Sequence, residues 1–268
     1  MDPVFAQAAL RHWAAAAQNP GPYRGAAGIF GSPGGLAASL IIGSAYLPDP
    51  AGSVHRSGAA TTGMAHGIAG PLALLATAHA AGWSVAGQRA ALQSAAHWLL
   101  RWRTEGAPSW APYLTGEDLD RDTATPSAGR RDGWCYGAPG IGRALILAGS
   151  ALADSQLTTA GHAAISSLAD RPAHLWDVDG PTVCHGYAGV LQSATTSHAG
   201  TGERAAAAVA DAFNPHLTFA FRHLHHGVPS DEPGLLTGSA GIALTLADHG
   251  QLPAPPVPTR WDSLLLLS

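Results

Sequence analysis

Apolar residues along this chain gather into runs that each follow a short glycine motif of the form Gly-x-[Ala/Pro]-Gly. The runs cover 71–78, 141–153, 190–194 and 242–247. Within the second run, Ile141, Leu145 and Ala148 recur at a spacing that would line one face of an α-helix. Strict alternation of apolar and polar residues, the pattern of a half-buried strand, is rare. We therefore predict a mainly α-helical chain.

The glycine motif is an internal repeat. Its clear copies lie at 64–70, 134–140, 183–189 and 235–241. The later copies are about fifty residues apart, which is room for two helices and their connections. Second helices are predicted over 86–101 and 202–213. Helical hairpins that repeat at this period stack into a solenoid or close into a toroid, and in both cases the turns between helices gather at one end.

Three segments depart from the repeat. The segment 104–131 is rich in proline and charged residues and is expected to form an irregular loop excursion over the mouth of the domain. A weak motif copy at 31–34 makes 1–58 a degenerate N-terminal repeat. The segment 261–267 is apolar and is expected to dock as a terminal cap. We treat 1–268 as a single α/α domain of helical hairpins, with the ring incomplete at the N-terminus.

Composition and charge exclude several classes of protein. Hydrophobic residues make up 46% of the chain and charged residues 12%, which excludes a fully disordered chain. A net charge of -4 and a pI of about 6.4 argue against nucleic-acid binding. The sequence contains neither an apolar run of about 18 residues nor a signal-peptide pattern. We therefore expect no transmembrane segment and a cytoplasmic location.

The candidate chemistry stands directly before the repeat glycines. Cys135, Cys184 and His185 all occupy this place in their motif copies. If the turns converge, these side chains converge too, and they are ligand types that Zn²⁺ prefers. Three protein ligands would leave a fourth position open, as in catalytic zinc sites. Taken singly, two buried cysteines and a core histidine would explain the same residues.

Further polar residues lie close to these motifs. His66 fills the matching place of an earlier copy, either as a core or capping histidine or as a general acid or base. Arg131 and Asp132 precede Cys135 and form either a loop ion pair or, for Arg131, a contact with the site. The histidine cluster at 223–226 is expected to be a solvated rim, with a second metal site as the alternative.

Several strings of the sequence together resemble the lanthionine synthetase C-like family, the lanthipeptide cyclases. They are Arg-Asp-Gly-Trp-Cys-Tyr-Gly at 131–137, Cys-His-Gly-Tyr-Ala-Gly at 184–189, Gly-Met-Ala-His-Gly at 63–67, the motif at 235–241 and the Trp-Asp pair at 261–262. The resemblance runs from about residue 60 to the C-terminus. It implies an α/α toroid that binds zinc through Cys135, Cys184 and His185.

The resemblance also implies a reaction. A cysteine thiol of a peptide adds to a dehydroalanine or dehydrobutyrine and forms a lanthionine or methyllanthionine thioether ring. Zinc activates the thiol, and two protein thiolates keep the bound sulfur nucleophilic. His66 matches the family's active-site histidine and would transfer the proton, while Arg131 and Tyr136 match residues near the metal and would have supporting roles.

The implied partners are a dehydrated ribosomal precursor peptide and a dehydratase or other modification enzyme. One departure from the family pattern keeps an alternative open. The family usually has an aspartate four residues before the glycine of the first repeat, and this chain has Ala27 or Gly21 there, depending on the frame. The alternative is a non-catalytic, zinc-containing scaffold that binds peptide within a modification complex. An incomplete toroid would expose helix faces for a partner or a second copy to cover.

Overall fold

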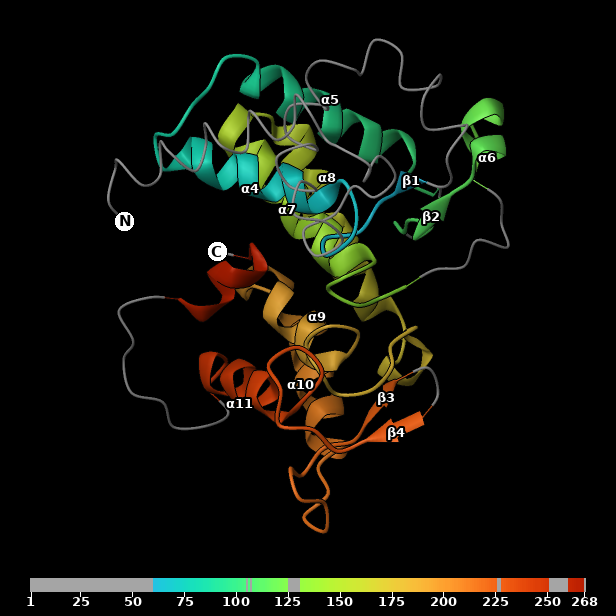
Figure 1. Ribbon diagram of the computed structural model, residues 1–268, viewed down its shortest axis with the longest axis vertical. Helices are drawn as coiled ribbons and strands as arrows, with labels where there is room; N and C mark the ends of the chain where they lie inside the picture. The colour runs from blue at the N-terminus through green and yellow to red at the C-terminus, as the bar shows by residue number, and fades with distance from the viewer. Residues whose placement is uncertain are drawn as a thin grey trace, which may run out of the picture.

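The computed structural model describes residues 60–104, 106, 108–124, 131–225, 228–250 and 260–267. These residues form eight α-helices, several short 3-10 helices and two two-stranded antiparallel sheets (Figure 1). The helices are α4 (Ala69–Ala80), α5 (Gln88–Arg101), α6 (Gly116–Arg121), α7 (Ala138–Leu152), α8 (Ser155–Ser166), α9 (Tyr187–Ser193), α10 (Ala199–Asp211) and α11 (Ser239–Asp248). The strands are β1 (Ala60–Thr61), β2 (Tyr113–Leu114), β3 (His223–His225) and β4 (Val228–Ser230). The expected N-terminal repeat at 1–58 lies outside the described residues, as do Gly21 and Ala27.

The helices form a row of hairpins. The helices that follow the glycine motifs pack in chain order, α4 on α7, α7 on α9 and α9 on α11. Each of the first three also packs against the next helix of the chain, so that α5, α8 and α10 complete the hairpins (Figure 1). This confirms the prediction of a mainly helical chain, with the two small sheets as additions. Closure of the row into a toroid stays a prediction. No helix in the described ranges combines the length and hydrophobicity needed to cross a bilayer.

Backbone hydrogen bonds join the motif turns to one another. Equivalent residues, two places before the first glycine of their motifs, form these bonds. In each of the first three motifs this residue donates its N–H to the carbonyl of its counterpart in the next motif. The bonds run from Ala65 to Cys135 (3.2 Å), from Cys135 to Cys184 (3.1 Å) and from Cys184 to Leu236 (2.8 Å). The four turns therefore lie side by side in one register, at the end of the domain where the hairpins begin.

The second glycine of each of the last three motifs, Gly140, Gly189 and Gly241, lets these turns approach closely. A Cβ atom there would lie within about 2 Å of a carbonyl oxygen of its own turn and close to a side chain of the preceding turn. The distances to that side chain are 3.1 Å from Gly140 to Met64, 3.0 Å from Gly189 to Trp134 and 2.8 Å from Gly241 to Val183. Glycine is required here because there is no room for a side chain.

The core lies along the apolar faces predicted from the sequence. Ile141, Leu145 and Ala148 of α7 are fully buried. The C-terminal segment docks as expected: it forms a 3-10 helix, η5 (Trp261–Leu265), and the indole N–H of Trp134 donates to the carbonyl of Leu265 at 3.0 Å. This bond ties the end of the chain to the turn that carries Cys135.

The described part of 104–131, which is 104, 106, 108–124 and 131, includes regular secondary structure where the composition suggests an irregular excursion. Strand β2 pairs with β1, and α6 follows it. Thr115 begins α6 with a capping box, in which its hydroxyl accepts from the N–H of Asp118 while the buried Asp118 carboxylate accepts from the N–H of Thr115. The indole of Trp110 donates to the carbonyl of Leu99 at 2.7 Å and anchors the segment on α5.

A histidine pair, the buried His198 and the half-buried His162, joins α8 to the start of α10. His198 closes the 3-10 helix η4 (Thr196–His198), and its Nδ1 accepts the N–H of Thr195. Its Nε2 lies 2.9 Å from Nδ1 of His162. Since Nδ1 accepts, the neutral ring carries its hydrogen on Nε2 and donates it to His162. Burial, with the charges of His162 and Arg143, lowers the pKa of His198 to about 4.

Replacement of Gly189 by alanine is expected to destabilise the fold by at least about 2 kcal/mol, because the new methyl group meets backbone and the base of Trp134. The matched control is Gly202→Ala in α10, where the nearest atoms lie 3.7 Å away or more and helix propensity favours alanine. Urea unfolding followed by tryptophan fluorescence measures both variants. Equal midpoints for the two would contradict the close approach of the turns.

The buried neutral His198 makes stability depend on pH. Its folded pKa lies below that of a free imidazole, so its contribution is complete above pH about 6.5 and is lost as the pH falls through about 4. The loss is on the order of 1–3 kcal/mol. We expect His198→Gln to show a shallower fall of the urea midpoint between pH 7.5 and 4.5 than the wild type, with both proteins stripped of metal. Parallel curves would show that His198 is not responsible.

Candidate metal centre

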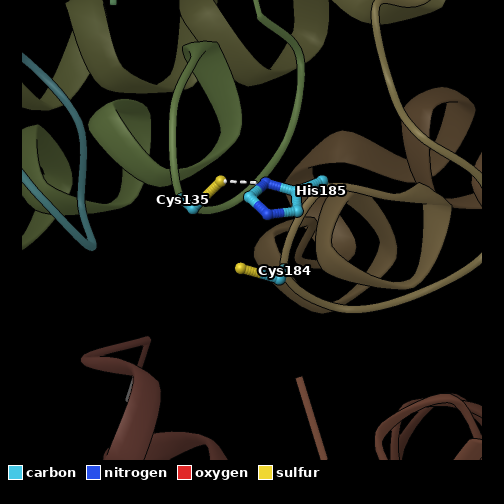
Figure 2. A group of neighbouring side chains, drawn as sticks. All are labelled: Cys135, Cys184 and His185. Atoms are coloured by element: carbon cyan, nitrogen blue, oxygen red, sulfur yellow. Dashed lines mark hydrogen bonds between the residues drawn. The ribbon is translucent and has the colours of Figure 1, made fainter. Parts of the chain in front are cut away.

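Three side chains from two neighbouring turns meet in one cluster. Cys135 belongs to the turn before α7, and Cys184 and His185 to the turn before α9. Their Sγ and ring nitrogen atoms all lie within 4.8 Å of one another (Figure 2). The backbone bond from Cys135 to Cys184 brings the two turns together at this point. The three residues that stand at matching places of the repeat in the sequence therefore lie together in the structure.

An irregular turn lets the neighbours Cys184 and His185 serve the same site. The N–H of Cys184 donates to the carbonyl of Leu236, and the carbonyl of His185 accepts from the N–H of Asp179 at 2.8 Å. The following Gly186 is extended rather than helical. In an α-helix, adjacent side chains would diverge by about 100°. Here the ring of His185 instead places its Nδ1 2.7 Å from Sγ of Cys135.

Electrostatics within the cluster favour one thiolate and one thiol. Hydrogen bonds from Cys135 and then His185 lower the pKa of Cys184 to about 5 despite its burial. The same interaction with Cys184, together with burial, raises the pKa of Cys135 far above its usual range. Hydrogen bonding to Cys184 also raises the pKa of His185. The cluster thus holds a thiolate among soft donors, which suits a zinc-type cation that displaces the remaining protons.

Arg131 and Asp132 do not pair with each other. Arg131 donates from Nη2 to Asp179 at 2.6 Å and from Nη1 to Asp177 at 3.3 Å. Burial alone would lower the pKa of Arg131, but the hydrogen bond and charge of Asp179 raise it, and the charge of Asp177 adds to this. Arg131 therefore binds the loop whose Asp179 N–H holds the carbonyl of His185.

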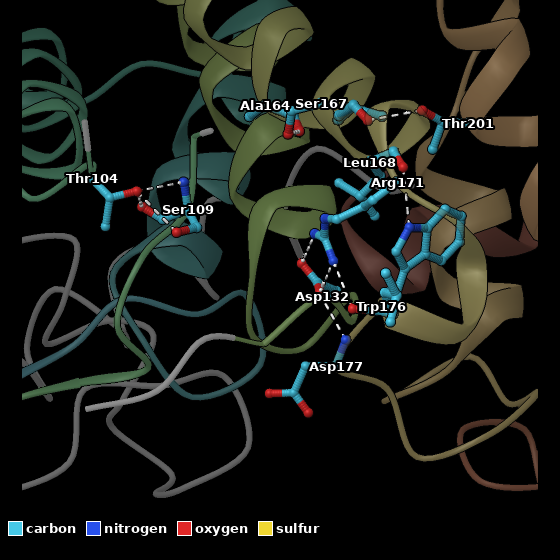
Figure 3. Close-up of polar contacts among 12 residues, drawn as sticks. Thr104, Ser109, Asp132, Ala164, Ser167, Leu168, Arg171, Trp176, Asp177 and Thr201 are labelled. Atoms are coloured by element: carbon cyan, nitrogen blue, oxygen red, sulfur yellow. Dashed lines mark hydrogen bonds and ion pairs between the residues drawn. The ribbon is translucent and has the colours of Figure 1, made fainter. Parts of the chain in front are cut away.

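Asp132 instead anchors a second loop to the same turn. Its fully buried carboxylate accepts two hydrogen bonds from Arg171, at 2.7 and 2.9 Å, and a third from the N–H of Asp177 at 2.8 Å (Figure 3). Nearby, the indole of Trp176 donates to the carbonyl of Leu168. The bidentate geometry holds the 171–177 segment rigidly against the turn that carries Cys135.

A short series of rings lies beside the cluster. His66 is exposed and stacks on Tyr136, with ring centroids 5.8 Å apart and an interplanar angle of 20°. Tyr136 also contacts Tyr113 of β2, whose hydroxyl donates to that of Tyr136 at 3.3 Å. The charge of His66 contributes to the lowered pKa of Cys184, while burial raises the pKa of Tyr136. Tyr113 carries no motif, and sequence reasoning missed it.

The prediction that the 223–226 cluster forms a solvated rim is wrong for His223. Its side chain is 2% exposed, stacks on His185 with centroids 6.1 Å apart and an interplanar angle of 18°, and contacts the hydroxyl of Thr182 through Nδ1 at 3.1 Å. Burial follows because the β3–β4 hairpin folds back over the turn, with the N–H of Leu224 bound to the carbonyl of Asp179. The side chain of His225 and residue 226 lie outside the described residues.

Comparison with known proteins places this arrangement among relatives. The family model for lanthionine synthetase C-like proteins matches residues 50–265. The nisin biosynthesis protein NisC of Lactococcus lactis subsp. lactis is 27% identical over 161 residues, which cover 59% of this chain and 38% of that protein. A solved structure of nisin cyclase is similar in fold, with a TM-score of 0.62 and 23% identity over 80% of this chain and 51% of that one. The chain therefore spans about half, or less, of the length of these relatives.

Metal content tests the donor set. His185→Ala and Cys184→Ser are each expected to reduce bound zinc from one equivalent per chain to a small fraction, because two ligands hold the ion far less tightly than three. The control is His216→Ala, which removes an exposed histidine away from the cluster and is expected to keep the full equivalent. Elemental analysis after dialysis against a weak chelator gives the answer. Unchanged zinc in the first two variants would exclude this site.

Proposed function

Because the chain belongs to the lanthionine synthetase C-like family, we propose that it is a zinc-dependent lanthipeptide cyclase. It would add cysteine thiols of a peptide to dehydroalanine or dehydrobutyrine residues of the same peptide and so form thioether rings. The observation that carries the proposal is the convergence of Cys135, Cys184 and His185 in one cluster, with His66 and Tyr136 at its edge.

Cys135, Cys184 and His185 would hold the zinc ion, and a soft donor set that includes the Cys184 thiolate suits it. The chemistry that a bound zinc would supply is a lowered pKa for the substrate thiol in the open coordination position. Arg131 would support this site indirectly. It binds the carboxylate of Asp179, whose N–H in turn holds the carbonyl of His185.

The addition needs a proton donor and a stabiliser of charge. The substrate sulfur forms a bond to Cβ, the carbon–carbon double bond opens, and its electron pair moves onto the neighbouring carbonyl as an enolate. A proton must then reach Cα. His66 is our candidate for this transfer, because it is an exposed imidazole beside the cluster and imidazole is the commonest general acid and base.

Tyr136 would stabilise the enolate by hydrogen bonding. Burial raises its pKa, which keeps the hydroxyl protonated at neutral pH. Tyr113 donates its own hydroxyl hydrogen to Tyr136, so the hydroxyl hydrogen of Tyr136 is available to a second acceptor. A donor aimed at the oxygen where negative charge develops lowers the barrier.

The substrate would be a dehydrated ribosomal peptide, since both reacting residues must be present in one chain. Supply of that substrate requires a dehydratase that eliminates water from serine or threonine, and such an enzyme is the partner we expect. The exposed ring of Tyr113 and the exposed His66 border the cluster on the side from which a peptide would approach. Free thiols persist in a reducing compartment, which favours action in the cytoplasm.

A synthetic peptide with one dehydroalanine and one cysteine tests the reaction. Ring formation leaves the mass unchanged but removes the thiol, so iodoacetamide no longer adds to the product. We expect His66→Ala to retain one zinc and lose activity about 100-fold or more, while His216→Ala remains active. Residual product from His66→Ala should contain both configurations at Cα, because the enzyme no longer delivers the proton from one side.

Two outcomes would contradict parts of the proposal. Loss of zinc from His66→Ala would make that residue structural. A wild-type protein that binds zinc and the peptide but forms no thioether would be the scaffold expected from the alternative interpretation of Ala27 and Gly21.

A further inference from the structure

The imidazole of His185 must keep one orientation if it is to act as a ligand. The lone pair of a ligating nitrogen has to point at the metal, and neighbouring groups usually fix the ring at that angle. In this chain the ring lies nearly parallel to that of His223, with centroids 6.1 Å apart and planes within 18° of parallel. Nδ1 of His185 then faces Sγ of Cys135 at 2.7 Å.

His223 is itself held by the turn that it supports. Its ring is almost fully buried, and its Nδ1 lies 3.1 Å from the hydroxyl of Thr182, which is also buried. Thr182 stands three residues before His185 in the same turn. Movement of the turn would therefore carry His223 with it, so the stack keeps its geometry.

A second connection links the strand to the turn through the backbone. The N–H of Leu224 donates to the carbonyl of Asp179 at 3.1 Å, and the N–H of Asp179 donates to the carbonyl of His185 at 2.8 Å. Gly180 allows this approach: it has a φ of 127°, and a Cβ atom there would meet the carbonyl of Arg222 at 3.2 Å. Side chain and backbone thus bind β3 to the metal-binding turn independently.

We propose that His223 is a positioning residue of the metal centre, one that holds the ring of His185 through a near-parallel, offset ring contact. It is not one of the ligands, because the cluster of mutually close donor atoms found in the described residues comprises Cys135, Cys184 and His185. The inference rests on the metal site of the proposed function and extends it to a residue outside the repeat motifs. What matters is a flat ring at position 223, held in place.

Three substitutions of His223 distinguish the contribution of a flat ring from that of side-chain volume alone. His223→Phe keeps a flat ring, His223→Leu fills similar space without one, and His223→Ala removes both. Zinc affinity is measured by competition with a chromogenic chelator, and the visible spectrum of the Co²⁺-substituted protein reports the coordination geometry. His216→Ala serves as the distant control.

We expect the leucine and alanine variants to bind zinc about 10- to 100-fold more weakly, with an altered Co²⁺ spectrum. The phenylalanine variant should stay within a few-fold of the wild type. Circular dichroism shows which variants are folded, and the comparison of phenylalanine with leucine decides the question if the alanine variant is not.

Equal zinc affinity and equal Co²⁺ spectra for the phenylalanine and leucine variants would overturn the role of stacking. Zinc affinity in all three variants equal to that of the wild type would also overturn the role of stacking. That outcome would leave the proposed function intact. A wild-type protein that binds no zinc would instead remove the metal site itself, and both proposals with it.

Discussion

The row of backbone hydrogen bonds between motif turns is the constraint on which the rest of this structure depends. Each bond joins the same position of two successive turns, from Ala65 through Cys135 and Cys184 to Leu236. Because the bonds use the main chain, they leave the side chains of the two cysteines free to face a common point. The repeat thus aligns the helical hairpins and builds the donor cluster with one set of interactions.

Close packing makes that row possible. Gly140 and Gly189 stand where a Cβ atom would collide with a carbonyl oxygen and with the preceding turn. The ion pair between the buried Asp132 and Arg171 then holds the 171–177 segment against the turn that carries Cys135. Arg131 holds the adjoining loop through Asp177 and Asp179. Close backbone packing and these ion pairs together hold the donor atoms of the cluster near one another.

Polarity is divided across the site in a way that suits the proposed chemistry. The soft donors are largely buried, and charge interactions are stronger in the protein interior than in water. His66, by contrast, is exposed. Tyr136 stands between the two, half-buried and in contact with both His66 and Tyr113. The buried ring of His223 stacks on His185. The exposed rings therefore border the cluster, while the ring of His185 contacts the buried His223.

The sequence by itself determined the helical runs, the repeat and which three side chains, Cys135, Cys184 and His185, come together. These features depend on near neighbours and on register: the spacing of Ile141 and Leu145 marks a buried helix face, and equal places in a repeat become neighbours in space. Only the tertiary structure decided that Arg131 binds Asp179 rather than the adjacent Asp132, and that Tyr113 and His223 reach the site. Those contacts join loops outside the repeat, and where such loops return depends on the packing of the whole domain, which no local pattern records.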